Sequence, residues 1–176
     1  DQALLACGRL DAMTTLLPAG APATIGEAFA HINAVTSPSL ADLKVMVLLE
    51  AAGLDMYRGM LPGTDNAEVA ALLEHNGREE MAHAHRVSKA ILAISGEDYP
   101  PPAAADNPYL AGPIPSAPIT AEALRGLAQG EFAGEGLYER WAANCGNAEA
   151  ARLFRLNGGE ERDHGDRDQF GHGQTS

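Results

Sequence analysis

Apolar residues recur at helical spacing along most of the 176-residue chain, in segments that clusters of Pro, Gly, Ser and Asn separate. Two shorter helices are predicted first, over Gln2–Leu17 and over Thr24–Val35. Four longer helices follow, at Leu40–Met60 and at about 64–94, 120–144 and 148–168. Aromatic residues make up only 5% of the chain, and its apolar content is mostly Ala and Leu, which favours helices over strands.

The connections between the four long helices differ in length. Short turns at Leu61-Pro62-Gly63 and at Cys145-Gly146-Asn147 predict two antiparallel helix hairpins. Between the hairpins, the segment from Tyr99 to Pro118 contains so many prolines that it predicts an extended crossover. We therefore predict an all-α four-helix bundle over residues 37–170, preceded by an N-terminal helical extension (1–36) and followed by a flexible tail (171–176).

An internal repeat with an offset of 81 residues relates the two hairpins. The motif E-x-A-G-x-x-x-Y begins at Glu50 and again at Glu131, and the motif N-G-x-E-E-x-x-H-x-x-R begins at Asn76 and again at Asn157. Helices of similar composition share Ala, Gly and Glu by chance, but they do not ordinarily repeat Tyr, His and Arg in register. The repeat therefore indicates two copies of one functional unit.

The repeated acidic residues and histidines have the spacing of metal ligands. A glutamate and a histidine three residues apart share one face of a helix, and a short turn places the leading glutamate of the hairpin opposite them. Four buried carboxylates without counter-charge would cost more than the net stability of a domain, and two divalent cations would neutralise them. The histidine nitrogens favour iron or manganese over calcium, with zinc as an alternative. The predicted ligands are Glu50, Glu80, His83, Glu131, Glu161 and His164.

Several neighbouring residues also face the predicted site. Tyr57 and Tyr138 follow the leading glutamates by two helical turns, so each phenol is expected to hydrogen-bond a ligand carboxylate, or else a backbone carbonyl in the core. Gly53 and Gly134 either leave room for dioxygen, peroxide or a bridging ligand, or allow close helix packing. Glu135 has no acidic counterpart in the first hairpin, and it is either a seventh ligand or a partly solvated glutamate.

From about residue 40 to residue 168, these motifs resemble those of the rubrerythrins and other ferritin-like di-iron carboxylate proteins. The resemblance implies a ferritin-like bundle, the six metal ligands named above, and carboxylate-bound tyrosines at Tyr57 and Tyr138. The chain departs from rubrerythrins at Gly134, where they carry a further glutamate. They also usually carry a C-terminal rubredoxin domain, whereas this chain contains no CxxC motif.

The expected function is that of a di-iron oxidoreductase which reacts with dioxygen or peroxide and receives electrons from an external donor. Tyr57 and Tyr138 would orient the ligand carboxylates or pass electrons or protons. One alternative is ferritin-like iron oxidation for storage or detoxification. Another is a non-catalytic site for iron, manganese or zinc.

The net charge of −12 argues against partners that are themselves anionic, namely nucleic acids and acidic membranes. No apolar run reaches the length of a membrane span. We therefore expect the protein to bind neither nucleic acid nor membrane. We also expect it to be cytoplasmic and to form a homodimer.

Overall fold

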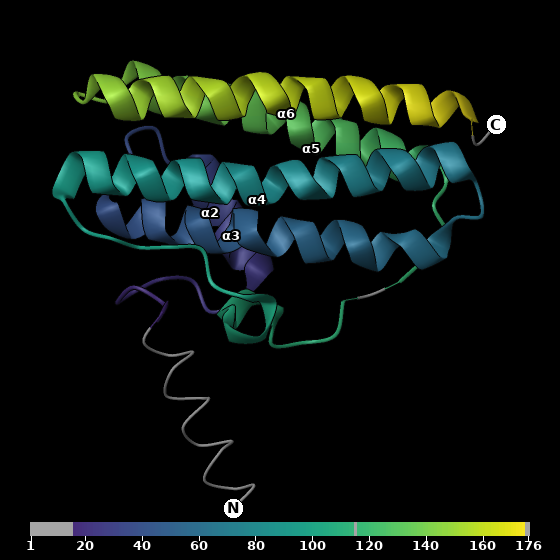
Figure 1. Ribbon diagram of the computed structural model, residues 1–176, viewed down its shortest axis with the longest axis horizontal. Helices are drawn as coiled ribbons and strands as arrows, with labels where there is room; N and C mark the ends of the chain where they lie inside the picture. Colours follow the sequence, from purple (N-terminus) through teal and green to yellow (C-terminus); the bar gives the residue numbers. More distant parts are fainter. Residues whose placement is uncertain (1–15, 115, 175–176) are drawn as a thin grey trace, which may run out of the picture.

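The computed structural model describes residues 16–114 and 116–174, with side chains as far as Gly171 (Figure 1). Within these ranges the chain forms only helices, so the all-α prediction is confirmed. The α-helices are α2 (Ile25–Ala34), α3 (Leu40–Met60), α4 (Ala67–Ser95), α5 (Ala121–Ala143) and α6 (Ala148–Gln174), and the short 3₁₀-helices are η1 (Leu61–Gly63), η2 (Ala104–Asp106) and η3 (Pro108–Leu110). The helix predicted over Gln2–Leu17 lies, except for its last two residues, outside the described part.

Local capping residues set the ends of the first three long helices where the sequence predicts them. Ser39 and Asp42 form a reciprocal capping box at the start of α3. The side chains of Asn66 and Thr120 accept hydrogen bonds from backbone amides in the first turns of α4 and α5. Gly96 ends α4 in the left-handed conformation, with φ = 76°, which a glycine adopts without strain.

The last helix is longer than predicted, and the expected flexible tail over 171–176 is wrong in its first residues. Helix α6 continues past Asp168 to Gln174. Gly171 is buried, and a Cβ atom on it would lie 3.2 Å from Leu72 and 3.4 Å from Leu124. The absence of a side chain lets α6 approach α4 and α5 closely, so packing supports the helix through a residue that disfavours helices.

The four long helices run alongside one another as two hairpins, α3 with α4 and α5 with α6 (Figure 1). Helices α4 and α6 pack closely on each other, whereas α3 and α5 have no comparable backbone contact. The crossover runs along α3, and the amide of Ile119 donates a hydrogen bond to the carbonyl of Gly63 at 2.8 Å. Helix α5 therefore begins beside the turn between α3 and α4, while α2 packs on α3. None of the helices in the described ranges combines the length and apolarity that crossing a membrane requires.

The interior has an apolar cluster toward each end of the bundle. The larger cluster contains Tyr138, Trp141 and Phe154, whose rings contact one another at centroid distances of 5.8–6.2 Å. The smaller cluster includes Tyr57 and Leu73. Between the two clusters the helices bury glutamates and histidines instead of apolar residues, so this middle band requires a chemical explanation.

Candidate metal centre

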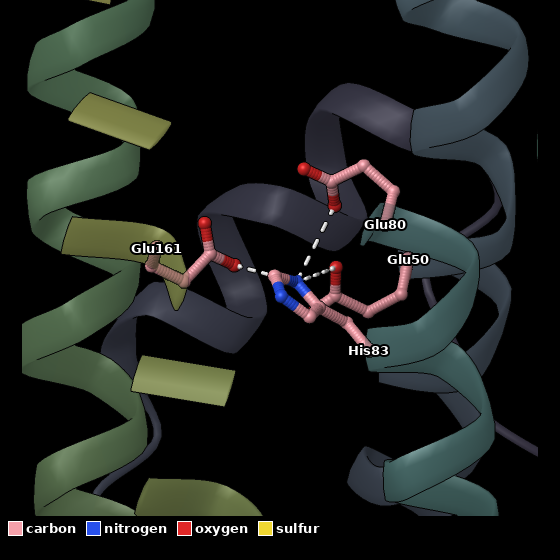
Figure 2. Close-up of side chains that lie close together, drawn as sticks. All are labelled: Glu50, Glu80, His83 and Glu161. Atoms are coloured by element: carbon pink, nitrogen blue, oxygen red, sulfur yellow. Dashed lines mark ion pairs between the residues drawn. The ribbon is translucent and has the colours of Figure 1, made fainter. Parts of the chain in front are cut away.

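The six predicted metal ligands come together in the middle of the bundle, in two groups. The first group is Glu50, Glu80, His83 and Glu161 (Figure 2), and the second is Glu80, Glu131, Glu161 and His164. In each group, the nitrogen or oxygen atoms that would bind a metal all lie within 4.8 Å of one another. Glu80 and Glu161 belong to both groups, so the two groups share one carboxylate from each hairpin.

Neither hairpin holds a complete group by itself. Figure 2 shows Glu161 reaching across from α6 toward His83 on α4, and Glu161 Oε1 lies 3.3 Å from His83 Nδ1. In the second group, Glu80 Oε1 lies 3.2 Å from His164 Nδ1. Each group therefore needs one carboxylate from the opposite hairpin, and the centre forms only when the two hairpins pack together.

The two histidines have the same orientation relative to the centre. Both are fully buried, and the Nδ1 atom of each points toward the ligand carboxylates. The Nε2 atom of His83 lies 3.1 Å from Glu160, and that of His164 lies 3.0 Å from Glu79. A proton on Nε2 that is donated to these glutamates leaves the Nδ1 lone pair free to bind a metal ion.

Arginines hold these outer glutamates in place. Arg86 on α4 binds both oxygens of Glu160 on α6, at 2.6 Å and 2.7 Å, and Arg167 on α6 binds Glu79 on α4. These charge-assisted hydrogen bonds join the two hairpins on the side of the centre where α4 packs on α6. The hydrogen bond to His83, and after it the one from Arg86, holds the pKa of Glu160 down to about 2.

The two tyrosines also bond across the hairpins. Tyr57 on α3 donates to Glu131 on α5, and Tyr138 on α5 donates to Glu50 on α3. Of the two expected partners, a ligand carboxylate or a backbone carbonyl, the carboxylate is therefore the one present. Burial, together with the negative charges of the neighbouring carboxylates, holds the pKa of both phenols well above the usual value, so each phenol keeps its proton.

The four central carboxyl groups differ in their affinity for protons. Burial raises the pKa of the shared Glu80 well above its usual value, and the charges of the other three carboxylates raise it further. Burial also holds the pKa of Glu161 high. For Glu50 and Glu131, burial is again the largest single influence and raises the pKa, but hydrogen bonds from a histidine, a neighbouring glutamate and a tyrosine, together with the charge of the histidine, outweigh it. The pKa of Glu131 falls to about 2. Burial lowers the pKa of His83, but its contacts with Glu160, Glu161 and Glu50 outweigh burial and raise this pKa well above its usual value. Without a cation, therefore, the shared glutamates and His83 all favour proton uptake, which offsets the missing positive charge.

Three buried atoms that face the two groups have no hydrogen-bond partner among the described residues: His83 Nδ1, His164 Nδ1 and Glu161 Oε2. A buried polar atom without a partner costs about 1–3 kcal/mol, so such atoms are rare in folded proteins. Bound cations would satisfy all three. The buried Glu/His groups could therefore hold metal ions, and their chemistry fits two divalent cations that accept mixed nitrogen and oxygen ligands.

The two glycines that face the centre lie against the shared glutamates. A Cβ atom on Gly53 would lie 2.8 Å from Glu80 Cγ, and one on Gly134 would lie 3.2 Å from Glu161 Cδ. The space beside each glycine is therefore occupied by a ligand side chain. Of the two predicted explanations, close packing fits this geometry, although it is packing against a glutamate rather than against another helix backbone.

Glu135 lies in neither ligand group. Its carboxylate pairs with Arg162 at 2.7 Å, and its side chain is 30% exposed. This geometry fits the partly solvated glutamate that the sequence suggests as the alternative to a seventh ligand.

One buried acid near the centre was missed in the sequence. Asp168 is fully buried, accepts a hydrogen bond from the amide of Asn76 at 3.2 Å, and has a second oxygen without a hydrogen-bond partner in the described ranges. Burial and the charge of Glu131 raise its pKa to about 8. The 81-residue repeat contains the signal that could have revealed it, because the equivalent position in the first hairpin is Val87.

Comparison of the chain with protein-family models, with curated proteins and with solved structures found no match. The assignment of a function to this centre therefore depends on its own geometry and chemistry.

Proposed function

We propose that the chain is a ferritin-like, dinuclear metal carboxylate protein which holds two ions, preferentially iron, and reduces dioxygen or peroxide. The single observation that carries this proposal is that the two buried ligand groups share Glu80 and Glu161. Shared carboxylates hold two cations close together, which suits a reaction in which both ions act on one small molecule. Electrons come from an external donor.

The donor set favours iron. Four carboxylates balance the charge of two divalent cations, and one imidazole nitrogen for each ion disfavours magnesium and calcium, which prefer oxygen ligands. When bound, two ferrous ions would supply both Lewis acidity and electrons for the reduction of dioxygen or peroxide.

The surrounding residues of the chain have distinct roles in this proposal. Glu160 and Glu79 fix the orientation and the tautomer of the two histidines. Tyr57 and Tyr138 hold Glu131 and Glu50 by hydrogen bonds and keep a phenolic proton beside each of these carboxylates. Through that carboxylate, the phenolic proton is placed to be delivered when a reduced oxygen species needs it.

An anaerobic titration with ferrous iron tests the proposal. The expected result is the binding of two ions per chain, followed by an optical change and oxygen uptake when air or peroxide is admitted. Glu161→Gln removes a shared ligand and is expected to lower the stoichiometry below two. Glu135→Gln makes the same chemical change at a residue outside both groups and is expected to leave the stoichiometry at two.

Bound iron that gives neither an optical change nor oxygen uptake would disprove the oxidative function and leave a non-catalytic metal site. Size-exclusion chromatography of the same sample separates the storage alternative, because a storage protein would elute as a large hollow assembly.

A further inference from the structure

A cavity of about 640 Å³ lies between α3 and α5 and reaches the metal centre. All four central carboxylates contribute to its lining, so the cavity gives direct access to them. On the opposite side of the centre, the buried histidines and the Arg86–Glu160 and Arg167–Glu79 pairs close the space between α4 and α6. Among the described residues, the cavity is therefore the approach through which a molecule could reach the ligands.

The walls of the cavity are apolar. Beyond the four carboxylates, only Tyr57 and Asn33 contribute polar side chains, and no lysine, arginine or histidine of the described ranges lines it. The large apolar residues that line it include Phe29, Met46, Met56, Met60, Leu127 and Leu137. Small-molecule sites usually have volumes of about 300–1,000 Å³ and mainly hydrophobic linings, so this cavity has the size and character of such a site. The three methionines are flexible and can adapt to the shape of an occupant.

Two solvent-exposed glycines on α5 contribute to the lining of the cavity. Gly126 and Gly130 line it, and a Cβ atom on either would meet no other atom within 4 Å. Packing against the protein therefore does not account for a glycine at these positions, although each costs about 1 kcal/mol of helix stability relative to alanine. Larger residues there would fill the cavity. Dioxygen and peroxide need far less space than these residues leave, so the volume points to a larger occupant.

We propose that this cavity binds a neutral, apolar organic substrate between α3 and α5, in contact with the carboxylates of the metal centre. We expect a neutral molecule because no cationic side chain in the lining could pair with an anionic head group. The four carboxylates would also repel such a group. As a substrate site, the cavity depends on the function proposed above. Binding itself can nevertheless be measured without turnover.

Two fluorescent probes that differ by one sulfonate test this specificity. N-phenyl-1-naphthylamine is neutral, and 1-anilinonaphthalene-8-sulfonate has nearly the same rings with a negative charge. They are titrated separately into the purified protein, both as isolated and after loading with Zn²⁺. We expect the neutral probe to bind at one site per chain, at least about tenfold more tightly than the sulfonate. Equal binding of both probes, or no binding of the neutral one, would overturn the proposal.

Filling the cavity tests the location. Gly126→Phe places a large side chain in the cavity, whereas Gly136→Phe makes the same change on the same helix at a position that does not line it. The expected result is a loss of about tenfold or more in affinity for the neutral probe in the first variant only. Both variants should still bind two metal ions, which shows that the bundle and the centre are intact. Equal affinities in the two variants would place the probe elsewhere and contradict the proposal.

The outcomes separate this inference from the proposed function. If the neutral probe binds as expected but iron gives no reaction with dioxygen or peroxide, the cavity proposal is supported and the oxidative function is excluded. If iron reacts but the probe does not bind, the function stands and the cavity proposal fails. A dimer that Gly126→Phe dissociates would show that a second copy of the chain covers the cavity, and would also overturn the proposal.

Discussion

Replacing Gly53 by alanine perturbs the centre through one methyl group. The new Cβ atom would lie 2.8 Å from Glu80 Cγ, closer than real Cβ atoms approach other atoms, and 3.0 Å from Glu80 Cβ, which is tighter than most real contacts. Both contacted atoms are near the backbone of α4, so a rotation of the carboxylate group cannot relieve the contact. Helices α3 and α4 must move apart, or Glu80 must leave the position in which both ligand groups share it.

Two opposing contributions set the size of the effect. Alanine stabilises a helix by about 1 kcal/mol relative to glycine, whereas overpacking a close contact costs about 1–3 kcal/mol. Gly126→Ala gains the first contribution without the second, because nothing lies within 4 Å of its new methyl group. Gly134→Ala is intermediate, because its nearest contact, at 3.2 Å, is the terminal carboxyl carbon of Glu161, which can shift. We therefore expect Gly53→Ala to be about 1–3 kcal/mol less stable than Gly126→Ala, with Gly134→Ala between them.

Urea denaturation of the three metal-free variants measures these differences, and thermal melting should show a gap of roughly 5 °C between the extremes. The stoichiometry of ferrous iron is the second measurement, and Gly53→Ala should bind fewer than two ions because Glu80 serves both groups. If Gly53→Ala proved as stable as Gly126→Ala and bound two ions, the glycine would not be required by the proximity of Glu80, and the packing explanation would be wrong.

Three further predictions concern the tyrosines, the metal and the buried aspartate. Tyr57→Phe and Tyr138→Phe each remove a hydrogen bond to a ligand carboxylate, so each should lower the free energy of unfolding by about 1–3 kcal/mol in urea titrations, whereas no change in either would exclude a structural role for the phenols. Metal ions at about one hundred times their dissociation constant should stabilise the protein by about 3 kcal/mol per site, and a melting experiment should show this gain in Glu135→Gln but largely lose it in Glu161→Gln. The raised pKa of Asp168, about 8 against an ordinary 3.8, means that the folded state holds a proton which the unfolded state releases, so stability should fall as the pH rises from about 4 through 8. Asp168→Asn should remove this fall. Between pH 5 and pH 9 the variant should therefore gain on the order of 4 kcal/mol of stability relative to the wild type, and a parallel pH dependence in both proteins would show that Asp168 does not cause the fall.

Helix ends and the members of the two Glu/His groups could be predicted from the sequence because they depend on short-range features. Ser39 and Gly96 act on the backbone within a few residues, so the limits of α3 and α4 follow from them. The Glu-x-x-His spacing places Glu80 and His83 on one helix face in any fold that keeps the helix. The end of α6 could not be predicted in this way, since α4 and α5 support Gly171 from outside the helix.

The pairing across the hairpins could not be read from the spacing either. A separation of thirty residues places Glu50 opposite Glu80 in the same hairpin, but it does not say which helix of the other hairpin α4 will face. The packing of α4 on α6 determines this pairing, because it brings Glu161 to His83 and Glu160 to Arg86. The cavity follows from the same packing, because α3 and α5 then lie apart on the other side of the bundle.

The contacts between the two hairpins also show where the two ligand groups differ. Nearly every contact of one position has an equivalent at the other, as with Tyr138 on Glu50 and Tyr57 on Glu131, so an approximate two-fold axis relates the hairpins. Asp168 breaks this symmetry, because the equivalent residue is the apolar Val87. Its carboxyl group lies on the side of Glu131, whose charge raises the pKa of Asp168, and a cation bound there would in turn favour the ionised aspartate. The two ions should therefore bind with different affinities in the wild type. In Asp168→Val, which restores the residue of the first hairpin, calorimetric titration with metal should show two affinities closer to each other, and an unchanged difference would exclude Asp168 as its source.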